Sequence, residues 1–175
     1  IWGLFYFSPI VLSIKFVKMK HIYIFLILSS FLFSQVKLSV SSGSKFDDKE
    51  INSNLSFSYD KVLFKQPNIK SGIGLEYMLK TDSKDFSYTN FSSNSIYIFS
   101  RFIYEKKWAS YLRLGITEID SDQLTSNGSY IAFGADYKLN KKWYVESGYH
   151  ISIIDDKSYN KIIFSIIRHF DKKDD

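Results

Sequence analysis

The feature that most constrains the fold is an alternation of apolar and polar residues with a period of two, which recurs from Val36 onward. Such alternation is typical of β-strands whose two faces meet different surroundings, and helical spacing of apolar residues is nearly absent. The sequence therefore predicts an all-β fold. We expect eight strands, at residues 36–43, 54–64, 68–80, 94–105, 108–118, 129–139, 142–153 and 160–170.

Short and long connections alternate between these segments. Tight connections follow the second, fourth and sixth segments, at 65–67, 105–107 and 140–141. Longer polar connections follow the first, third, fifth and seventh segments, and Asn127-Gly128 in the third of them is expected to form a tight turn. An antiparallel up-and-down barrel in a bacterial outer membrane has this rhythm, with tight turns in the periplasm and longer loops outside the cell.

The two faces of the segments differ in bulk. In 68–80, Ile73, Leu75 and Tyr77 share one face, while Gly72 and Glu76 share the other. The interior of an eight-stranded barrel is narrow, which suits the small and polar face. The bulky face is then expected to meet lipid, and most segments are close to the roughly 9–11 residues that a tilted transmembrane strand needs.

Charged residues recur on the expected inner face, including an arginine near the middle of each of two adjacent segments. A buried charge without a partner costs several kcal/mol, so we expect the cations and carboxylates to pair, partly through bidentate contacts. Such a network would plug the lumen, which argues against a general diffusion pore. The residues of this expected network are Asp60, Glu76, Arg101, Arg113, Asp136, Glu146 and His150.

Aromatic residues flank the tight connections. Tyr104 and Trp108 stand on either side of one Lys-Lys step, and Tyr137 and Trp143 stand on either side of another. Amphipathic rings gather where a membrane meets water, so we expect these four residues and Phe170 to form an interfacial belt.

The amino-terminal part has a different pattern. A basic step at Lys18 to Lys20 precedes an apolar stretch at 22–33, which predicts a cleavable signal peptide at 19–34 and a barrel domain at 35–175. Residues 1–18 precede the first methionine and are interpreted as an upstream, non-native extension, and a membrane-anchoring helix is the alternative for this part.

Composition excludes several classes of protein. The chain has no cysteine, so neither disulfides nor thiolate metal sites hold it together. Its formal charge is +5, but three of its 23 Lys and Arg precede residue 35, where no acidic residue occurs. The rest is nearly balanced, which argues against a nucleic-acid partner. No metal-ligand spacing, phosphate loop or dinucleotide motif is present, so no metal or cofactor is expected.

Two stretches resemble the small OmpA- and OmpX-like outer-membrane β-barrel proteins of Gram-negative bacteria. "FGADYKLNKKWYVESGYHISI" at 133–153 is similar to the family's penultimate hairpin, and "KIIFSIIRHF" at 161–170 is similar to its last strand. The resemblance implies an outer-membrane location after secretion to the periplasm, and recognition of Phe170 by the barrel-assembly machinery. Two features depart from the family: 171–175 follow Phe170, and Arg168 falls on the lipid-facing phase, where it is expected to snorkel to the interface.

These observations predict a non-enzymatic, monomeric barrel that contacts outer-membrane lipid and lipopolysaccharide, with a structural role or a surface ligand at its loops. A secreted soluble β-sandwich or lipocalin-like binding module is the alternative. A remoter one is a lipid A-modifying enzyme, because His150-Ile151-Ser152 resembles the His-x-Ser pair of the lipid A deacylases. Ile153 stands where that family has asparagine, and its glutamate has no counterpart here.

Overall fold

The structure is a computed structural model that describes residues 34–46, 49–81, 91–120, 125–155 and 157–170. The expected signal peptide, apart from Ser34, lies outside these residues, as do the expected upstream extension and the five residues after Phe170. The domain boundaries therefore stay predictions, and the fold described below is that of the barrel alone.

Nine strands form among the described residues, and eight of them are long. The long strands have 11 to 14 residues each, which is enough for a tilted strand to cross a membrane. In chain order the strands are β1 (Ser34–Phe46), β2 (Lys49–Ile51), β3 (Leu55–Lys65), β4 (Ile69–Thr81), β5 (Phe91–Ile103), β6 (Trp108–Asp120), β7 (Thr125–Lys138), β8 (Trp143–Ile154) and β9 (Lys157–Phe170).

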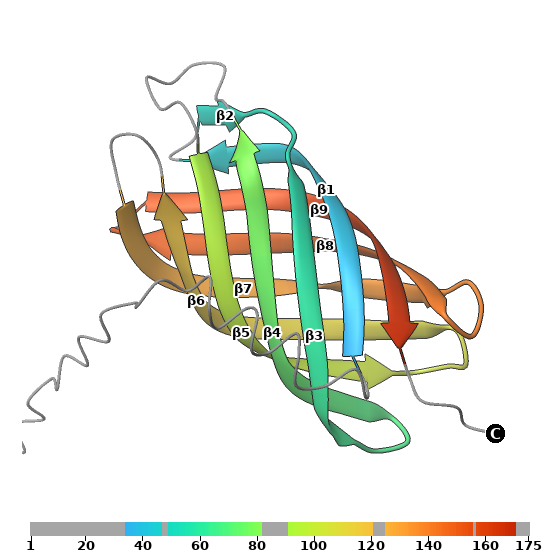
Figure 1. The fold of residues 1–175 in the computed structure, drawn as a ribbon. Helices are drawn as coiled ribbons and strands as arrows, with labels where there is room; N and C mark the ends of the chain where they lie inside the picture. Colours follow the sequence, from blue (N-terminus) through green and yellow to red (C-terminus); the bar gives the residue numbers. More distant parts are fainter. Residues whose placement is uncertain (1–33, 47–48, 82–90, 121–124, 156, 171–175) are drawn as a thin grey trace, which may run out of the picture. The chain divides into compact units, whose positions relative to one another are not determined.

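The eight long strands close into a barrel (Figure 1). Each pairs antiparallel with the next long strand along the chain, and β9 pairs with β1 to close the circle. At this seam Ser34 lies opposite Phe170 and Val40 lies opposite Phe164. Because closure leaves no strand edge, the backbone groups are paired within the barrel. The predicted eight-stranded antiparallel barrel is confirmed, and β2 only extends one end of β1.

The strand ends agree with the prediction at the tight turns and differ at the other end of the barrel. There β7 begins at Thr125 and β9 begins at Lys157, several residues earlier than expected. The expected long connection after the seventh strand is wrong, since only two residues separate Ile154 from Lys157. Polar side chains suggested loops, but ladder hydrogen bonds join backbone groups and continue through polar residues.

The expected turn at Asn127-Gly128 is also wrong. Both residues lie within β7, where Asn127 pairs with Glu118 and Gly128 pairs with Thr117. The glycine is needed for close approach, because a Cβ at Gly128 would come 2.0 Å from the carbonyl oxygen of Ile153. A glycine inside a strand often marks such a contact and not a turn.

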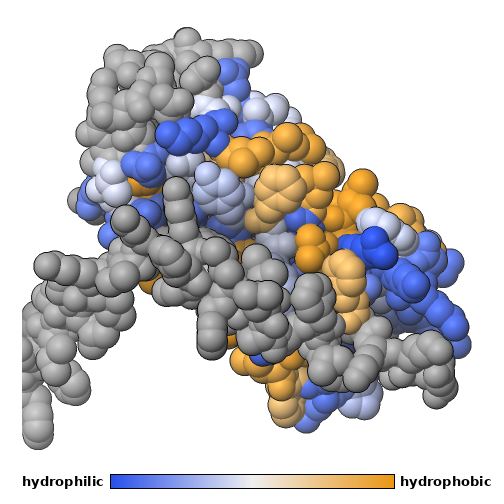
Figure 2. All heavy atoms as spheres, viewed as in Figure 1, coloured by the Kyte–Doolittle hydropathy of each residue, from blue (hydrophilic) through white to orange (hydrophobic). Residues whose placement is uncertain are grey.

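Large apolar side chains cover the outer surface of the barrel. Leu114 in the middle of β6 and Phe133 in β7 are both nearly half exposed, at 43% and 48%. Figure 2 shows apolar residues gathered across the middle of the barrel and hydrophilic ones toward its ends. Leu75 shares this outward phase but is only 8% exposed. Exposed apolar residues also include Val36, Leu38, Val40, Leu55, Phe57, Ile73, Ile98, Leu112, Ile116, Ile162, Phe164 and Ile166.

This arrangement contradicts the soluble alternative. A soluble sandwich or lipocalin-like barrel would place Leu112, Leu114 and Phe133 in its centre, and they lie on the outside. Apolar patches of this extent are rare on soluble monomers and mark contact with lipid or a partner. A closed barrel with an apolar outer band is the form in which β-strands cross a membrane.

Candidate functional site

The interior of the barrel is the candidate site, and it is lined by polar side chains. Alternation along β1 turns Gln35, Lys37, Ser39 and Ser41 inward, and all four are buried. Hydroxyl groups pair across neighbouring strands, as in the 2.8 Å contact between the Oγ atoms of Ser39 and Ser165. Small polar residues leave room for the longer charged side chains, which extend across the narrow lumen.

Lys37 joins two carboxylates at one side of the interior. Its Nζ lies 2.6 Å from Oδ2 of Asp60 and 3.4 Å from Oε2 of Glu146. The Lys37–Asp60 contact is an ion pair by distance, although it does not satisfy hydrogen-bond geometry. Asp60 also accepts a 2.7 Å hydrogen bond from the hydroxyl of Tyr97. Since β1, β3, β5 and β8 supply these residues, the contacts pass through the lumen.

Arg113 occupies the centre of this interior and is almost fully buried, at 1% exposed. Its Nη2 donates to Oε2 of Glu146 at 2.5 Å, and Nη1 lies 3.2 Å from Nε2 of His150. The guanidinium also stacks over the ring of Tyr111, 4.1 Å from its centroid. A planar, delocalised cation suits such a site, because it can pair with a carboxylate and stack on an aromatic ring at the same time.

Glu76 anchors a second group of contacts. Lys161 donates to Oε1 of Glu76 at 2.5 Å, and the hydroxyl of Tyr130 donates to Oε2 at 3.3 Å. Nδ1 of His150 lies 3.4 Å from the same Oε2 and 2.9 Å from the hydroxyl of Tyr130. His150 shares the inward phase of Glu146 along β8, and its contacts join it to Glu76, Tyr130 and Arg113.

Arg101 forms a third group near the end of the barrel that carries the tight turns. Its Nε lies 2.5 Å from Oδ2 of Asp136, and Nη1 donates to Oε1 of Gln35 at 2.7 Å. The pair with Asp136 is again an ion pair by distance without ideal hydrogen-bond geometry. Glu146 lies further away, 4.0 Å from Nη2 of Arg101.

The structure thus places every expected interior residue within the lumen and joins them through two residues that the sequence analysis missed. The expected set held two arginines against four carboxylates, and Lys37 and Lys161 balance it at four and four. Their phase could have identified both, because Lys37 alternates with Val36 and Leu38.

An apolar cluster inside the barrel was also missed. Met78, Ile119, Ile154 and Tyr159 are buried together near the strand ends opposite the tight turns. The hydroxyl of Tyr159 contacts Sδ of Met78 at 3.0 Å and accepts a 3.2 Å hydrogen bond from Nδ2 of Asn54. It could not be predicted from the sequence, because these four residues come from four separate strands.

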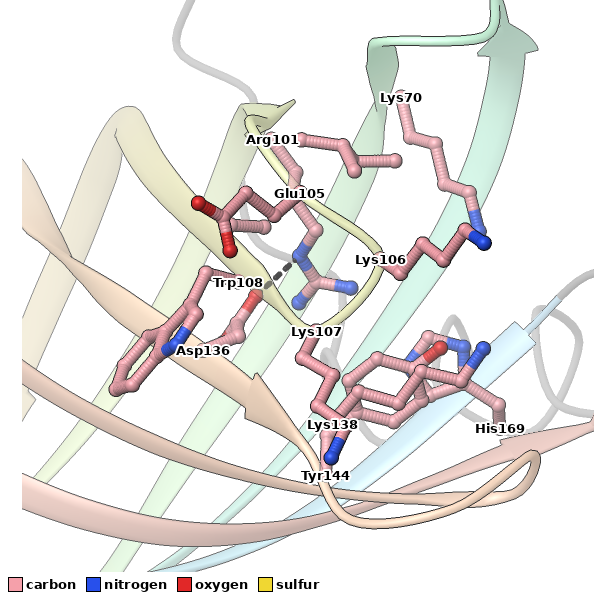
Figure 3. A pocket seen from close by; sticks show the side chains of 12 residues that line it. Lys70, Arg101, Glu105, Lys106, Lys107, Trp108, Asp136, Lys138, Tyr144 and His169 are labelled. Atoms are coloured by element: carbon pink, nitrogen blue, oxygen red, sulfur yellow. Dashed lines mark ion pairs between the residues drawn. The ribbon is translucent and has the colours of Figure 1, made fainter.

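A cavity of about 150 Å³ opens at the tight-turn end, below the Arg101–Asp136 pair (Figure 3). Lysines of the β5–β6 turn and of β4 and β7 surround it, and His169 of β9 lines it. The imidazole of His169 stacks on the ring of Tyr144, with centroids 4.0 Å apart. This cavity lies in the mouth of the lumen and was not expected from the sequence.

Aromatic residues lie at the same end, where the belt was expected. Tyr104, Trp108 and Trp143 are exposed, and the ring of Trp108 packs against Tyr137 with centroids 4.8 Å apart. Arg168 is exposed near the end of β9. Its guanidinium lies 5.5 Å from the ring of Trp143 and 5.1 Å from the ring of Phe170. Snorkelling of this arginine to a membrane interface stays a prediction.

The geometry gives little support to catalysis at His150 and Ser152. Both are buried, and His150 uses its two ring nitrogens for Arg113, Tyr130 and Glu76. A nucleophilic serine needs a base within hydrogen-bond reach. No cluster of three or more potential metal ligands occurs in the described part of the chain. In the same part, no helix is long and apolar enough to span a membrane.

Solved structures share the closed barrel described above. The attachment invasion locus protein Ail of Yersinia pestis is 11% identical over 78% of this chain and 95% of its own, with a TM-score of 0.55. Neisserial surface protein A is 14% identical, with coverages of 79% and 97% and a TM-score of 0.54. The chain has the fold of the small outer-membrane β-barrels. The N-terminal barrel of Pseudomonas aeruginosa OprF agrees, at 11% identity, coverages of 77% and 96%, and a TM-score of 0.56.

The resemblance to OmpA- and OmpX-like barrels is therefore confirmed at the level of the fold. The predicted location in an outer membrane agrees with this fold. No protein-family model and no curated protein matches the sequence. By their names, these similar proteins are an attachment and invasion protein, a surface protein and an amino-terminal barrel domain.

Proposed function

We propose that this protein is a non-enzymatic, monomeric barrel of the bacterial outer membrane that meets surface ligands through its longer connections and does not serve as a diffusion pore. The observation that carries the proposal is the filled lumen. Arg113, Glu146 and Lys37 meet at its centre, and at most 1% of each side chain is exposed. Opening a water path there would require separating ion pairs whose loss costs about 3–5 kcal/mol each.

The closed lumen is tested by conductance. Purified protein reconstituted into planar bilayers is expected to show no steady ohmic conductance, because side chains from non-adjacent strands meet across the lumen. A general porin measured in the same lipid is the positive control. Stable channel steps in every successful insertion would contradict a plugged barrel.

The role at the surface rests on the end opposite the tight turns. The connections there include those from β4 to β5, at 82–90, and from β6 to β7, at 121–124. Both are mostly polar, and 82–90 carries charges of both signs. Ail has been crystallised with the heparin analogue sucrose octasulfate. That likeness supports a search for a surface ligand of this chain. It does not identify one, since similarity at 11% identity extends to the fold alone.

Loop replacement tests this role. Cells that display the barrel are exposed to a panel of glycosaminoglycans and host matrix proteins, and any binding is expected to vanish when 82–90 and 121–124 become short Gly-Ser linkers. Replacing the tight connection at Gln66 to Asn68 is the matched control, because it changes the opposite end. Binding that persists without these two loops, or is lost equally in the control, would refute their role at the surface.

Contacts during assembly and in the membrane complete the proposal. The exposed apolar band would contact the acyl chains of outer-membrane lipid and lipopolysaccharide. β9 ends in Phe170 and closes the barrel against β1, which supports recognition of this strand by the barrel-assembly machinery. An amino-terminal signal peptide at 19–34 would bring the chain to that machinery. Replacing Phe170 by Ser is expected to lower the assembled fraction in cells while leaving refolding in detergent intact.

A further inference from the structure

The mouth of the lumen at the tight-turn end has the charge of an anion site. Five cationic side chains line its cavity, namely Lys70, Arg101, Lys106, Lys107 and Lys138. Only two carboxylates line it, Glu105 and Asp136. Asp136 is already paired with Arg101 at 2.5 Å, which leaves Glu105 as the other carboxylate of the cavity lining, next to Lys106 and Lys107 on the same turn.

The lysines come from three parts of the barrel that the tight turns bring together. Lys106 and Lys107 lie on the β5–β6 turn, Lys70 lies near the start of β4, and Lys138 ends β7 (Figure 3). Cationic side chains that line one cavity give it a positive potential, which favours an anion there. Lys70 pairs with Arg101 and Lys138 pairs with Tyr144 in the strand ladder, so the backbone fixes these two positions.

A buried nitrogen provides a second and independent observation. His169 lines the same cavity and is only 5% exposed. Its Nε2 is buried and has no hydrogen-bond partner among the described residues. Nδ1 lies 3.4 Å from Nε2 of Gln35, and the stacked ring of Tyr144 holds the imidazole in place. Buried polar atoms of native proteins almost always have a partner, which points to a ligand or water in this cavity.

We propose that this mouth binds a phosphate-type anion, with the lysines around it and His169 at its wall. Phosphate offers several acceptor oxygens to donors that approach from different directions, and lysine binds it as a compact point charge. A cavity of about 150 Å³ suits a group of this size. The phosphate could be free in the periplasm or belong to a phospholipid headgroup at the rim. The inference goes beyond the proposed surface role and does not depend on it.

The test is a titration of the purified, detergent-solubilised protein with inorganic phosphate, followed by ³¹P nuclear magnetic resonance at constant ionic strength. The double variant Lys106→Gln with Lys107→Gln removes two lining lysines. The matched control is Lys141→Gln with Lys142→Gln, which removes two exposed lysines from the adjacent β7–β8 turn, outside the cavity lining. Both pairs change the net charge equally, at the same end of the barrel.

We expect inorganic phosphate to bind the wild type saturably. The Lys106 and Lys107 replacements should weaken this binding about tenfold or more, and the control replacements should weaken it less than about twofold. His169→Phe keeps a ring on Tyr144 but removes Nε2, and it is expected to weaken binding several-fold. Equal losses in both lysine pairs would show general attraction to a basic rim and overturn the site. Absence of saturable binding to phosphate, and to the lipid phosphate described next, would also overturn it.

A second arm distinguishes the two sources of phosphate. The protein is reconstituted in phosphatidylcholine alone or with phosphatidylglycerol, and the ³¹P signal of each lipid is measured. If the headgroup is the ligand, the phosphatidylglycerol signal is perturbed and the Lys106 and Lys107 replacements abolish that perturbation. If free phosphate is the ligand, inorganic phosphate binds with the same affinity in both lipid compositions, and the phosphatidylglycerol signal is not perturbed. Gel mobility with and without boiling confirms that each variant is folded.

Discussion

Arg113 shows how a single charged side chain is accommodated inside this barrel. Its guanidinium pairs with Glu146, contacts His150 and lies over the ring of Tyr111. The sequence identified its inward direction, because Leu112 and Leu114 flank it in the opposite phase. Its partners could not be predicted, since Glu146 lies on β8, two strands away from β6, and only closure and register bring them together.

Replacing Arg113 by Met is expected to lower the free energy of unfolding by about 3–5 kcal/mol, because Glu146 then stays buried without its nearest cation. The double variant Arg113→Met with Glu146→Leu is expected to recover much of this loss. Urea titrations in detergent, followed by tryptophan fluorescence, measure both values. Lys142→Met on the exposed β7–β8 turn is the control and should change little. A double variant that is no more stable than Arg113→Met would contradict the pairing.

Gly148 illustrates a close approach inside the lumen. A Cβ at this position would come 1.9 Å from the hydroxyl oxygen of Tyr111 and 2.8 Å from the carbonyl oxygen of Phe133. We expect Gly148→Ala to cost about 1–3 kcal/mol through overpacking. Tyr111→Phe should relieve part of that cost, so the two changes should be coupled in a double-mutant cycle measured by urea unfolding. Additive effects would show that the ring does not block this site.

The strands themselves were largely predictable, and their ends were not. Alternation located all eight barrel strands because one face of each meets lipid and the other a polar lumen. It failed beyond the apolar band, where β7 continues through Thr125 and Asn127 without bulky residues. Lys37 was missed although Val36 and Leu38 flank it in the opposite phase near the start of β1.

Replacing Asn127 by Thr tests whether this position lies in a strand or in a turn. Thr favours strands and Asn favours turns, and Asn127 is exposed opposite Glu118 in the ladder. The structure predicts a change of less than about 0.5 kcal/mol in the free energy of unfolding, of either sign. Ser129→Thr, two residues further along the same face, is the matched comparison. A loss well above 1 kcal/mol, limited to Asn127, would favour the turn.

Leu114→Arg tests the depth of β6 in the membrane. Leu114 lies midway along the strand and faces outward. A charge there is expected to cost about 2–4 kcal/mol, whereas Tyr104→Arg, at the exposed rim, should cost about 0–1 kcal/mol. Reversible unfolding from lipid vesicles measures the difference. Similar costs at the two positions would mean that the middle of β6 is not inside the bilayer.

The barrel as a whole combines an apolar outer band with an interior that two groups of side chains fill at different depths. Ion pairs around Arg113 fill its middle, and the cluster of Met78, Ile119, Ile154 and Tyr159 packs nearer the end opposite the tight turns. The class of fold was predictable from alternation and connection lengths. The cavity at the mouth was not, because it depends on how turns from separate strands converge around His169.

The direction of the apolar face can be measured directly, because the chain contains no cysteine. Single cysteines at Phe57, Leu114 and Phe164 are spin-labelled in lipid vesicles, and their collisions with oxygen and with a water-soluble nickel complex are compared by electron paramagnetic resonance. A label at Lys106 on the tight turn is the water-exposed reference. The structure predicts that the first three labels collide with oxygen and exclude nickel. If the nickel complex collides with the labels at Phe57, Leu114 and Phe164 as often as with the label at Lys106, the apolar face does not meet lipid and the account is contradicted.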